Sequence, residues 1–192
     1  MANETTLLTA RLHLSAFAPD DAEDVFAYAS LDEASRYMTF ESHASLADSE
    51  RFIERVSSAP DTQFDWAVRE QGDDTVRGAI ELTVRSPAEA EVHYALHPSL
   101  WGRGFATEGL RAVLNWAFRT YEDLERIVAP IVDVNERSVR VVEKSAMSFR
   151  SDYVEHWPKH GRDLRMVVWG VDRETWAAQE WATEDHRTES LR

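Results

Sequence analysis

The chain has 192 residues, 43% of them hydrophobic, which is typical of one globular domain with a full core. It contains no cysteine, which excludes disulfides, cysteine–zinc sites and a thiol nucleophile, and its formal net charge is −14. Such a surface repels nucleic-acid phosphates and favours cationic partners, so we expect no nucleic-acid partner. The polar first residues, Met1 to Thr6, show no secretory signal, and no apolar run predicts a membrane span, so a cytoplasmic location is expected.

The first half of the chain predicts one strand, several helices and then three strands. The expected elements before the three strands are a strand at 11–17, a helix from Pro19, a short helix at 32–37, and a helix capped by Ser45 or Asp48 and ended by Pro60. The three strands, at 64–69, 76–84 and 89–97, have short connections and predict an antiparallel meander.

A glycine-containing turn follows this meander and leads into an amphipathic helix. The first turn of a helix has N–H groups without intrahelical partners, at the positive end of the helix dipole. Gly102 and Gly104 let a ligand approach the backbone, and Arg103 adds a cation, so we interpret the turn as a pyrophosphate cradle. The alternative is a plain strand-to-helix turn. No Gly-Lys-Ser/Thr follows, and the third glycine is Gly109, which excludes a Walker loop and a dinucleotide fingerprint.

The second half predicts a strand at 126–132, a helix capped by Asn135 and a last hairpin. Pro130 lies within the strand and indicates an opening ladder or a bulge, because proline cannot donate to a ladder. The remaining expectations are hairpin strands at 151–157 and 162–171, a short helix capped by Asp172, and a polar, frayed tail at 183–192. The sum is an α+β chain of about seven strands and four or more helices, forming a single domain over 1–192.

Two motifs resemble those of the GNAT acetyltransferases. The turn Trp101-Gly102-Arg103-Gly104-Phe105-Ala106 resembles motif A. Residues 135–147 resemble the Asn-x-x-Ser-x-Arg-Val-x-Glu-Lys-x-Gly-Phe/Met segment of the branch containing the ribosomal-protein-alanine N-acetyltransferases. Residues 9–12 and 91–94 resemble two further motifs of that branch, Thr-x-Arg-Leu and Glu-Ile-Gly-Tyr. The resemblance runs from about 9 to 176, with departures at Ala146 and His93, where the branch usually has Gly, and at Glu81, where a small residue is common.

The resemblance implies a three-layer α/β/α GNAT fold, whose mostly antiparallel mixed sheet splays at the coenzyme site. It implies transfer of acetyl from acetyl-coenzyme A to a primary amine by direct attack in a ternary complex. The acceptor is either a protein N-terminal α-amine or a small amine, including a cationic one, and the chain is a monomer or a homodimer. The dispersed histidines show no metal-ligand spacing, so no metal is expected.

The resemblance also implies roles for particular residues. The coenzyme-binding set is Leu96, Trp101, Gly102, Arg103, Gly104, Phe105, Ala106, Thr107, Asn135 and Ser138. The backbone around Leu96 is expected to donate to the thioester oxygen. The acid is expected to be Ser138, which could instead bond its own backbone, and Asn135 is expected to cap the helix and also meet the coenzyme.

The expected base is Glu91, which shares one face of its strand with His93 and His97. A carboxylate and an imidazole two residues apart can relay a proton through water, although the same face could be a plain solvent-facing edge. Two other functions stay open on the sequence. One is an acetyl-coenzyme A sensor without turnover, and the other is a nucleotide-binding domain of another family.

Overall fold

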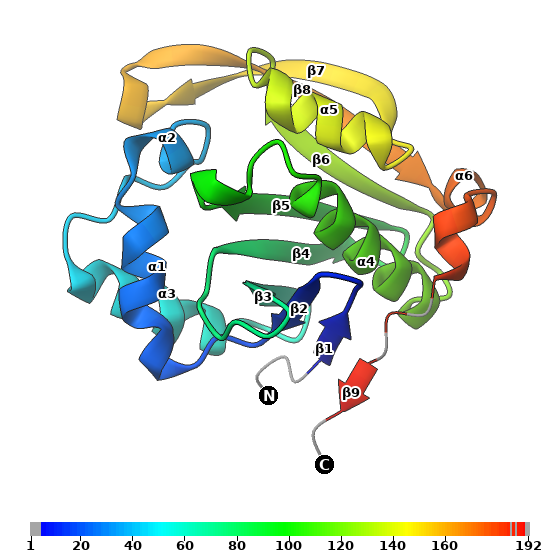
Figure 1. The fold of residues 1–192 in the computed structure, drawn as a ribbon. Coiled ribbons are helices and arrows are strands. Elements are labelled where there is room, and N and C mark those ends of the chain that lie inside the picture. The colour runs from blue at the N-terminus through cyan, green and yellow to red at the C-terminus, as the bar shows by residue number, and fades with distance from the viewer. Residues whose placement is uncertain (1–4, 185, 187, 191–192) are drawn as a thin grey trace.

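One nine-stranded sheet organises the molecule, as the computed structural model shows for residues 5–184, 186 and 188–190 (Figure 1). The order across the sheet is β7-β8-β6-β5-β4-β3-β2-β1-β9. The strands are β1 (Thr5–Leu8), β2 (Leu12–Ser15), β3 (Gln63–Glu70), β4 (Gly78–Ser86), β5 (Glu89–Leu96), β6 (Arg126–Val132), β7 (Ser148–Trp157), β8 (Arg162–Asp172) and β9 (Thr188–Ser190). Among the described strands, β5 and β6 form the one parallel pair, so the sheet is mixed and mostly antiparallel.

Helices lie on both faces of this sheet. The α-helices are α1 (Ala22–Ala29), α2 (Asp32–Ser35), α3 (Leu46–Ser57), α4 (Phe105–Thr120), α5 (Glu136–Lys144) and α6 (Arg173–Ala177). The 3-10 turns are η1 (Pro19–Asp21), η2 (Pro98–Leu100), η3 (Pro158–His160) and η4 (Glu180–Thr183).

Strand alternation separates two cores. Trp66 and Ile80 are cross-strand neighbours on the face covered by α4, within the large core that also holds Leu110 and Leu114. Ala67, on the opposite face of β3, packs in a second cluster that contains residues of α1 and α3. The expected three layers are therefore present.

The sheet opens between β5 and β6. Their register contains three pairs only, from Glu89 with Arg126 to Glu91 with Val128, after which the strands separate. In contrast, β6 stays paired with β8 as far as Val132. Pro130 lies beyond the last pair with β5, so its missing N–H is located where the ladder opens, as one of the two sequence interpretations required.

Several boundaries differ from the sequence predictions. The segment predicted as the first strand contains β2, which is preceded by a strand that the sequence did not predict, β1. Part of the tail that was predicted to be frayed forms β9, which pairs with β1. These two short strands raise the strand number from about seven to nine. Asp172 is the N-cap residue of α6, but its carboxylate binds Arg126 and Arg150 instead of the helix. The pairing of β9 and the contacts of Asp172 join residues that are distant in sequence, which local patterns do not show, whereas β1 pairs with β2 in a local hairpin.

Candidate active site

The N-terminus of α4 has the backbone geometry that the predicted anion-binding turn requires. Gly102 and Gly104 have φ angles of 72° and 84°, a left-handed conformation that glycine adopts without strain. The first helical bond runs from the Glu108 N–H to the Gly104 carbonyl, which leaves the N–H groups of Phe105, Ala106 and Thr107 without helical partners. These donors and the two glycines fit a pyrophosphate.

The third glycine of the stretch serves packing. A Cβ built on Gly109 would lie 2.7 Å from Cδ1 of Ile80 on β4. Gly109 therefore lets α4 approach the sheet closely, and it is not part of the cradle.

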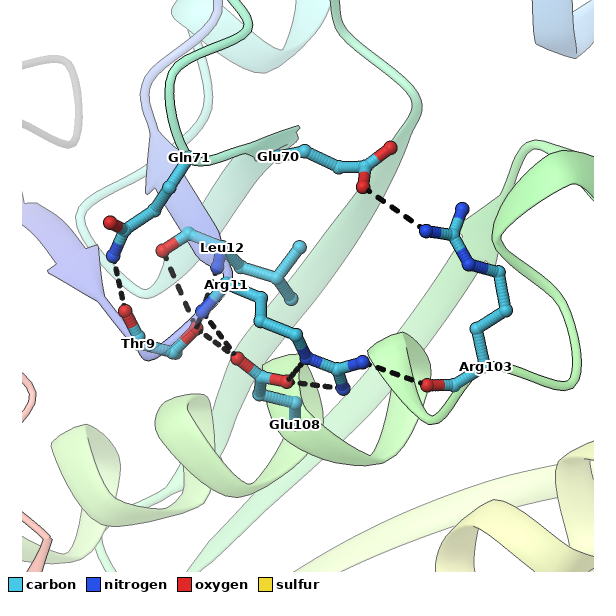
Figure 2. A network of polar contacts seen from close by, with 7 residues as sticks. All are labelled: Thr9, Arg11, Leu12, Glu70, Gln71, Arg103 and Glu108. Carbon is cyan, nitrogen blue, oxygen red and sulfur yellow. Dashed lines mark hydrogen bonds and ion pairs between the residues drawn. The ribbon is translucent and has the colours of Figure 1, made fainter.

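Two arginines flank the cradle: Arg103, which lies in the turn itself, and Arg11, which lies near the N-terminus of the chain (Figure 2). The Arg103 guanidinium is 4.7 Å from the centroid of the Phe105 ring and 3.6 Å from a Glu70 oxygen. The Arg11 guanidinium is 4.3 Å from the same ring, and it binds the Glu108 carboxylate and the Arg103 carbonyl. Phe105 itself is buried in the large core, so it contributes its backbone to the cradle.

The opening beyond Glu91 exposes backbone groups of β5. His97 donates its N–H to Arg77, so odd-numbered residues of β5 bond to β4. The N–H and C=O groups of Tyr94 and Leu96 consequently point to the other side, toward the opening. The Leu96 carbonyl already accepts the Trp101 indole N–H at 2.9 Å, which leaves the Leu96 N–H as the donor for a ligand oxygen.

Aromatic side chains bridge the opening from β5 to α5. The Tyr94 hydroxyl donates to the Ser138 carbonyl at 3.2 Å. The Arg137 guanidinium lies 4.5 Å from the centroid of the Trp101 ring. Burial raises the pKa of Tyr94, so its hydroxyl stays protonated and keeps this bond.

The Ser138 hydroxyl is held by Asn135 at the start of α5. The Asn135 side chain accepts from the Ser138 N–H and donates from its amide to the Ser138 hydroxyl at 3.0 Å. The hydroxyl oxygen is thereby an acceptor, and its proton has no acceptor among the described residues. Asn135 is confirmed as the N-cap of α5, as predicted.

Glu91 and His93 form a pair on the face of β5 opposite α4. His93 Nε2 lies 2.6 Å from a Glu91 oxygen, to which Arg85 also donates at 3.0 Å. The hydrogen bond from His93, followed by that from Arg85, lowers the pKa of Glu91 to about 2. His97 is separate from this pair, because its Nδ1 accepts from the Ser99 backbone.

A row of acidic residues continues from this pair across the sheet. In the strand registers, His93 is opposite Glu81, and Glu81 is opposite Asp65. Burial and the charge of Glu81 raise the pKa of Asp65 to about 6. The cations near this row are Arg85 and, from α3, Arg55.

The β7–β8 hairpin and the segment after α2 meet near this face (Figure 1). Lys159 at the hairpin tip donates to the carbonyls of Ser35 and Phe40 at 2.7 and 2.9 Å. Desolvation lowers the pKa of Lys159, and Trp157 beside it is buried. Residues of α2 and of the segment after it are thus joined to the last hairpin.

The sequence predicts the glycine turn but does not indicate four further residues that the fold brings near the opening. Arg11 lies in the Thr-x-Arg-Leu motif, to which the sequence assigns no role, and the hydrogen bond from Tyr94 to Ser138 joins residues that are distant in sequence. Arg137 and Asp65 carried no signal, because only the fold brings them to Trp101 and Glu81.

Within the described residues, no group of three or more His, Asp or Glu side chains is arranged to hold a metal ion. In the same part of the chain, no helix is long and apolar enough to cross a bilayer. The expectations of no metal and of a cytoplasmic location stay predictions.

The sequence model of the protein family described as acetyltransferase (GNAT) domain matches residues 11–148 of this chain. The uncharacterized N-acetyltransferase YoaA of Bacillus subtilis is 29% identical over 152 residues, which are 77% of this chain and 84% of the relative.

Solved structures share the fold. A GNAT-family acetyltransferase from Bacillus anthracis aligns with a TM-score of 0.79 at 22% identity, over 88% of this chain and 99% of that one. Spermidine N-acetyltransferase from Vibrio cholerae, in complex with coenzyme A and spermine, aligns with a TM-score of 0.74 at 18% identity, over 87% and 98%.

The matched segment contains the glycine turn, the β5–β6 opening and Ser138, and the unpartnered N–H groups there fit acetyl-coenzyme A. The chain therefore belongs to the GNAT acetyltransferase family and is an acetyl-coenzyme A-dependent acyltransferase.

Proposed function

We propose that this protein acetylates a primary amine that carries a second positive charge, and that His93 receives the proton released from the amine. The observation that carries the proposal is the row formed by His93, Glu81 and Asp65, which begins beside the β5–β6 opening.

Bound acetyl-coenzyme A supplies an activated acetyl group as a thioester. The residues of the chain hold it: the N–H groups at the start of α4 and Arg103 bind the pyrophosphate, and the Leu96 N–H donates to the thioester oxygen. The amine nitrogen forms a bond to the acetyl carbon as the carbon–sulfur bond breaks. Ser138 gives its hydroxyl proton to the departing sulfur and takes a proton back from solvent, while Asn135 holds the Ser138 oxygen in place.

Two features favour His93 over Glu91 as the proton acceptor. The low pKa of Glu91 makes its carboxylate a weak base near neutral pH, whereas histidine is the side chain that most often serves as a general base. His93 is three residues before Leu96 and Glu91 is five, which is roughly 10 and 16 Å along the strand. In this account Glu91 is a positioning residue that orients the His93 ring through the 2.6 Å bond.

The distances of Glu81 and Asp65 from His93 lead us to expect a second positive charge on the acceptor. Adjacent strands are about 4.8 Å apart, so Glu81 and Asp65 lie roughly 5 and 10 Å from His93 along the sheet. An ammonium group at that distance from the reacting amine would favour the ionised form of Asp65, whose pKa is raised by burial and by the charge of Glu81. The relative that is named for spermidine is consistent with such an acceptor.

Calorimetric titration with acetyl-coenzyme A, followed by thiol-release assays, tests the proposal. The acceptors would be 1-aminobutane, 1,4-diaminobutane and peptides with a free N-terminus, with and without an adjacent lysine. We expect the amines with a second ammonium group to react with at least about tenfold higher kcat/KM, the equivalent of one charge-assisted contact.

The other outcomes contradict the proposal in distinct ways. Equal kcat/KM values for 1-aminobutane and 1,4-diaminobutane would show that the acidic row does not select the acceptor. Binding without thiol release for any amine favours the sensor function, and absence of binding removes the coenzyme cradle.

A further inference from the structure

Arg11, in the turn between β1 and β2, contacts the start of α4 with its side chain (Figure 2). Its Nε lies 2.7 Å from a Glu108 oxygen, and its Nη1 donates to the Arg103 carbonyl at 2.9 Å. The guanidinium also covers the Phe105 ring. One side chain thus touches three residues of the coenzyme turn.

The turn that carries Arg11 is itself held firmly. Glu108 accepts from the Thr9 hydroxyl at 2.6 Å and from the Arg11 backbone N–H at 2.9 Å. The Gln71 side chain donates to the Thr9 carbonyl. Arg11 is therefore fixed at both ends, by its backbone and by its guanidinium.

Arg103 is held much less tightly. Its side chain is 54% exposed, its ion pair with Glu70 spans 3.6 Å, and its bond to the Ser99 carbonyl spans 3.3 Å. A weak, exposed pair of this kind is easily exchanged for a stronger anion, so Arg103 can turn toward a phosphate. Arg11 cannot do so without leaving Glu108.

The bond from Arg11 to the Arg103 carbonyl determines where the next N–H points. A peptide unit is planar and trans, so the Arg103 carbonyl and the Gly104 N–H point in opposite directions. Holding the carbonyl toward Arg11 directs the Gly104 N–H away from Arg11. Gly104 at a φ of 84° would tolerate other orientations of this peptide, so an external contact is needed to choose one.

We propose that Arg11 is a positioning residue of the coenzyme site, which fixes the Arg103–Gly104 peptide so that the Gly104 N–H is aimed at the pyrophosphate. The proposal rests on the proposed use of acetyl-coenzyme A at this turn. It assigns a binding role to the Thr9–Leu12 segment, which lies far from the glycine turn in sequence.

The test compares two acetyl donors. Arg11→Ala should weaken acetyl-coenzyme A binding, measured by calorimetry, about tenfold or more, because a charge-assisted bond that orders the turn is lost. The kcat/KM for acetyl-pantetheine, which lacks the pyrophosphate, should stay within about twofold of wild type, since the Leu96 end of the site is unchanged.

A matched control and a conservative variant sharpen this test. Arg126 has the same exposure, 45%, and the same 2.7 Å bond from Nε to a carboxylate, but it lies at the start of β6. Arg126→Ala should therefore leave coenzyme binding unchanged. Arg11→Lys should lose most of the coenzyme affinity that Arg11→Ala loses, because a single ammonium group cannot bind both Glu108 and the Arg103 carbonyl as the guanidinium does.

Several results would overturn the proposal: unchanged binding in Arg11→Ala, full rescue by lysine, or an equal loss with both donors. If Arg11→Ala does not fold, Glu108→Gln tests the same brace, and its unchanged acetyl-coenzyme A affinity would also overturn it. Failure of the wild-type protein to bind acetyl-coenzyme A would instead refute the proposed function.

Discussion

The two ends of the β5–β6 opening are built in different ways. At the coenzyme end, the glycine turn and the first turn of α4 are contiguous in sequence and are braced from outside by Arg11. At the acceptor end, His93, Glu81 and Asp65 come from three strands, and α1, α3 and the hairpin tip surround their face. On the proposed function, most of the donor site is contiguous in sequence, whereas acceptor choice depends on residues that only the fold brings together.

The largest effect is expected at His93, at the acceptor end. His93→Ala should lower kcat/KM for thiol release by about 10²–10⁴-fold, the usual contribution of a general base, with acetyl-coenzyme A affinity unchanged. His156 is the matched control, because it also pairs with a carboxylate, Asp163 at 2.8 Å, but lies on exposed β7. Wild-type turnover in His93→Ala would show that His93 does not accept the proton.

The next prediction concerns how Asp65 changes the stability of the protein with pH. Its pKa is raised from 3.8 to about 6, so its contribution to stability is fully present below pH 3.8 and is lost as pH rises through about 6. Asp65→Asn should accordingly gain up to roughly 3 kcal/mol relative to wild type between pH 4 and pH 7. Urea denaturation at several pH values measures this, and a difference that does not change with pH would contradict it.

At the coenzyme end, Gly104→Val should weaken acetyl-coenzyme A binding about tenfold or more, because a branched side chain resists a φ of 84°. Gly161→Val is the control, since Gly161 has a φ of 57° but lies in the hairpin turn. Near-wild-type binding by Gly104→Val would show that this turn is not the cradle.

Ser138→Ala separates chemistry from binding at the same end. We expect turnover to fall about tenfold, less than for a typical general acid, because a thiolate is already a good leaving group. Coenzyme affinity should change by less than about threefold, because the backbone contacts of α5 remain. An unchanged rate would return Ser138 to the structural role of bonding within the first helical turn.

The smallest expected effect lies outside both ends. Ala146 is the one non-glycine residue with positive φ, 60°, among those described, and its N–H and that of Met147 close α5 onto Glu143 and Val142. Ala146→Gly should raise the free energy of unfolding by about 1 kcal/mol, because glycine adopts this conformation without strain. Coenzyme affinity should not change, and a loss of stability would contradict this account of the helix end.

The same contrast explains what the sequence could reveal. Gly102, Gly104 and Asn135 have roles fixed by the next few residues, and their conformations are as expected. Ala146 raised doubt about the turn after α5, yet the backbone forms that turn with alanine in it.

Long-range pairing could not be predicted. The contacts of Arg11 with Arg103, and of Tyr94 with Ser138, join segments separated by dozens of residues. Local periodicity identified β5 and its faces, but it could not show that Glu91 would be held ionised by His93 and Arg85.

The pH dependence of kcat/KM for thiol release, in wild type and in Glu91→Gln, tests the central claim most directly. The hydrogen bonds from His93 and Arg85 lower the pKa of Glu91 to about 2, so Glu91 stays ionised around neutral pH, and we predict that the acidic limb of the profile is still present in Glu91→Gln. Activity should fall in that variant but persist. Loss of all activity in Glu91→Gln, or a wild-type limb at the much lower pH of a carboxylate, would make Glu91 the base and contradict the account.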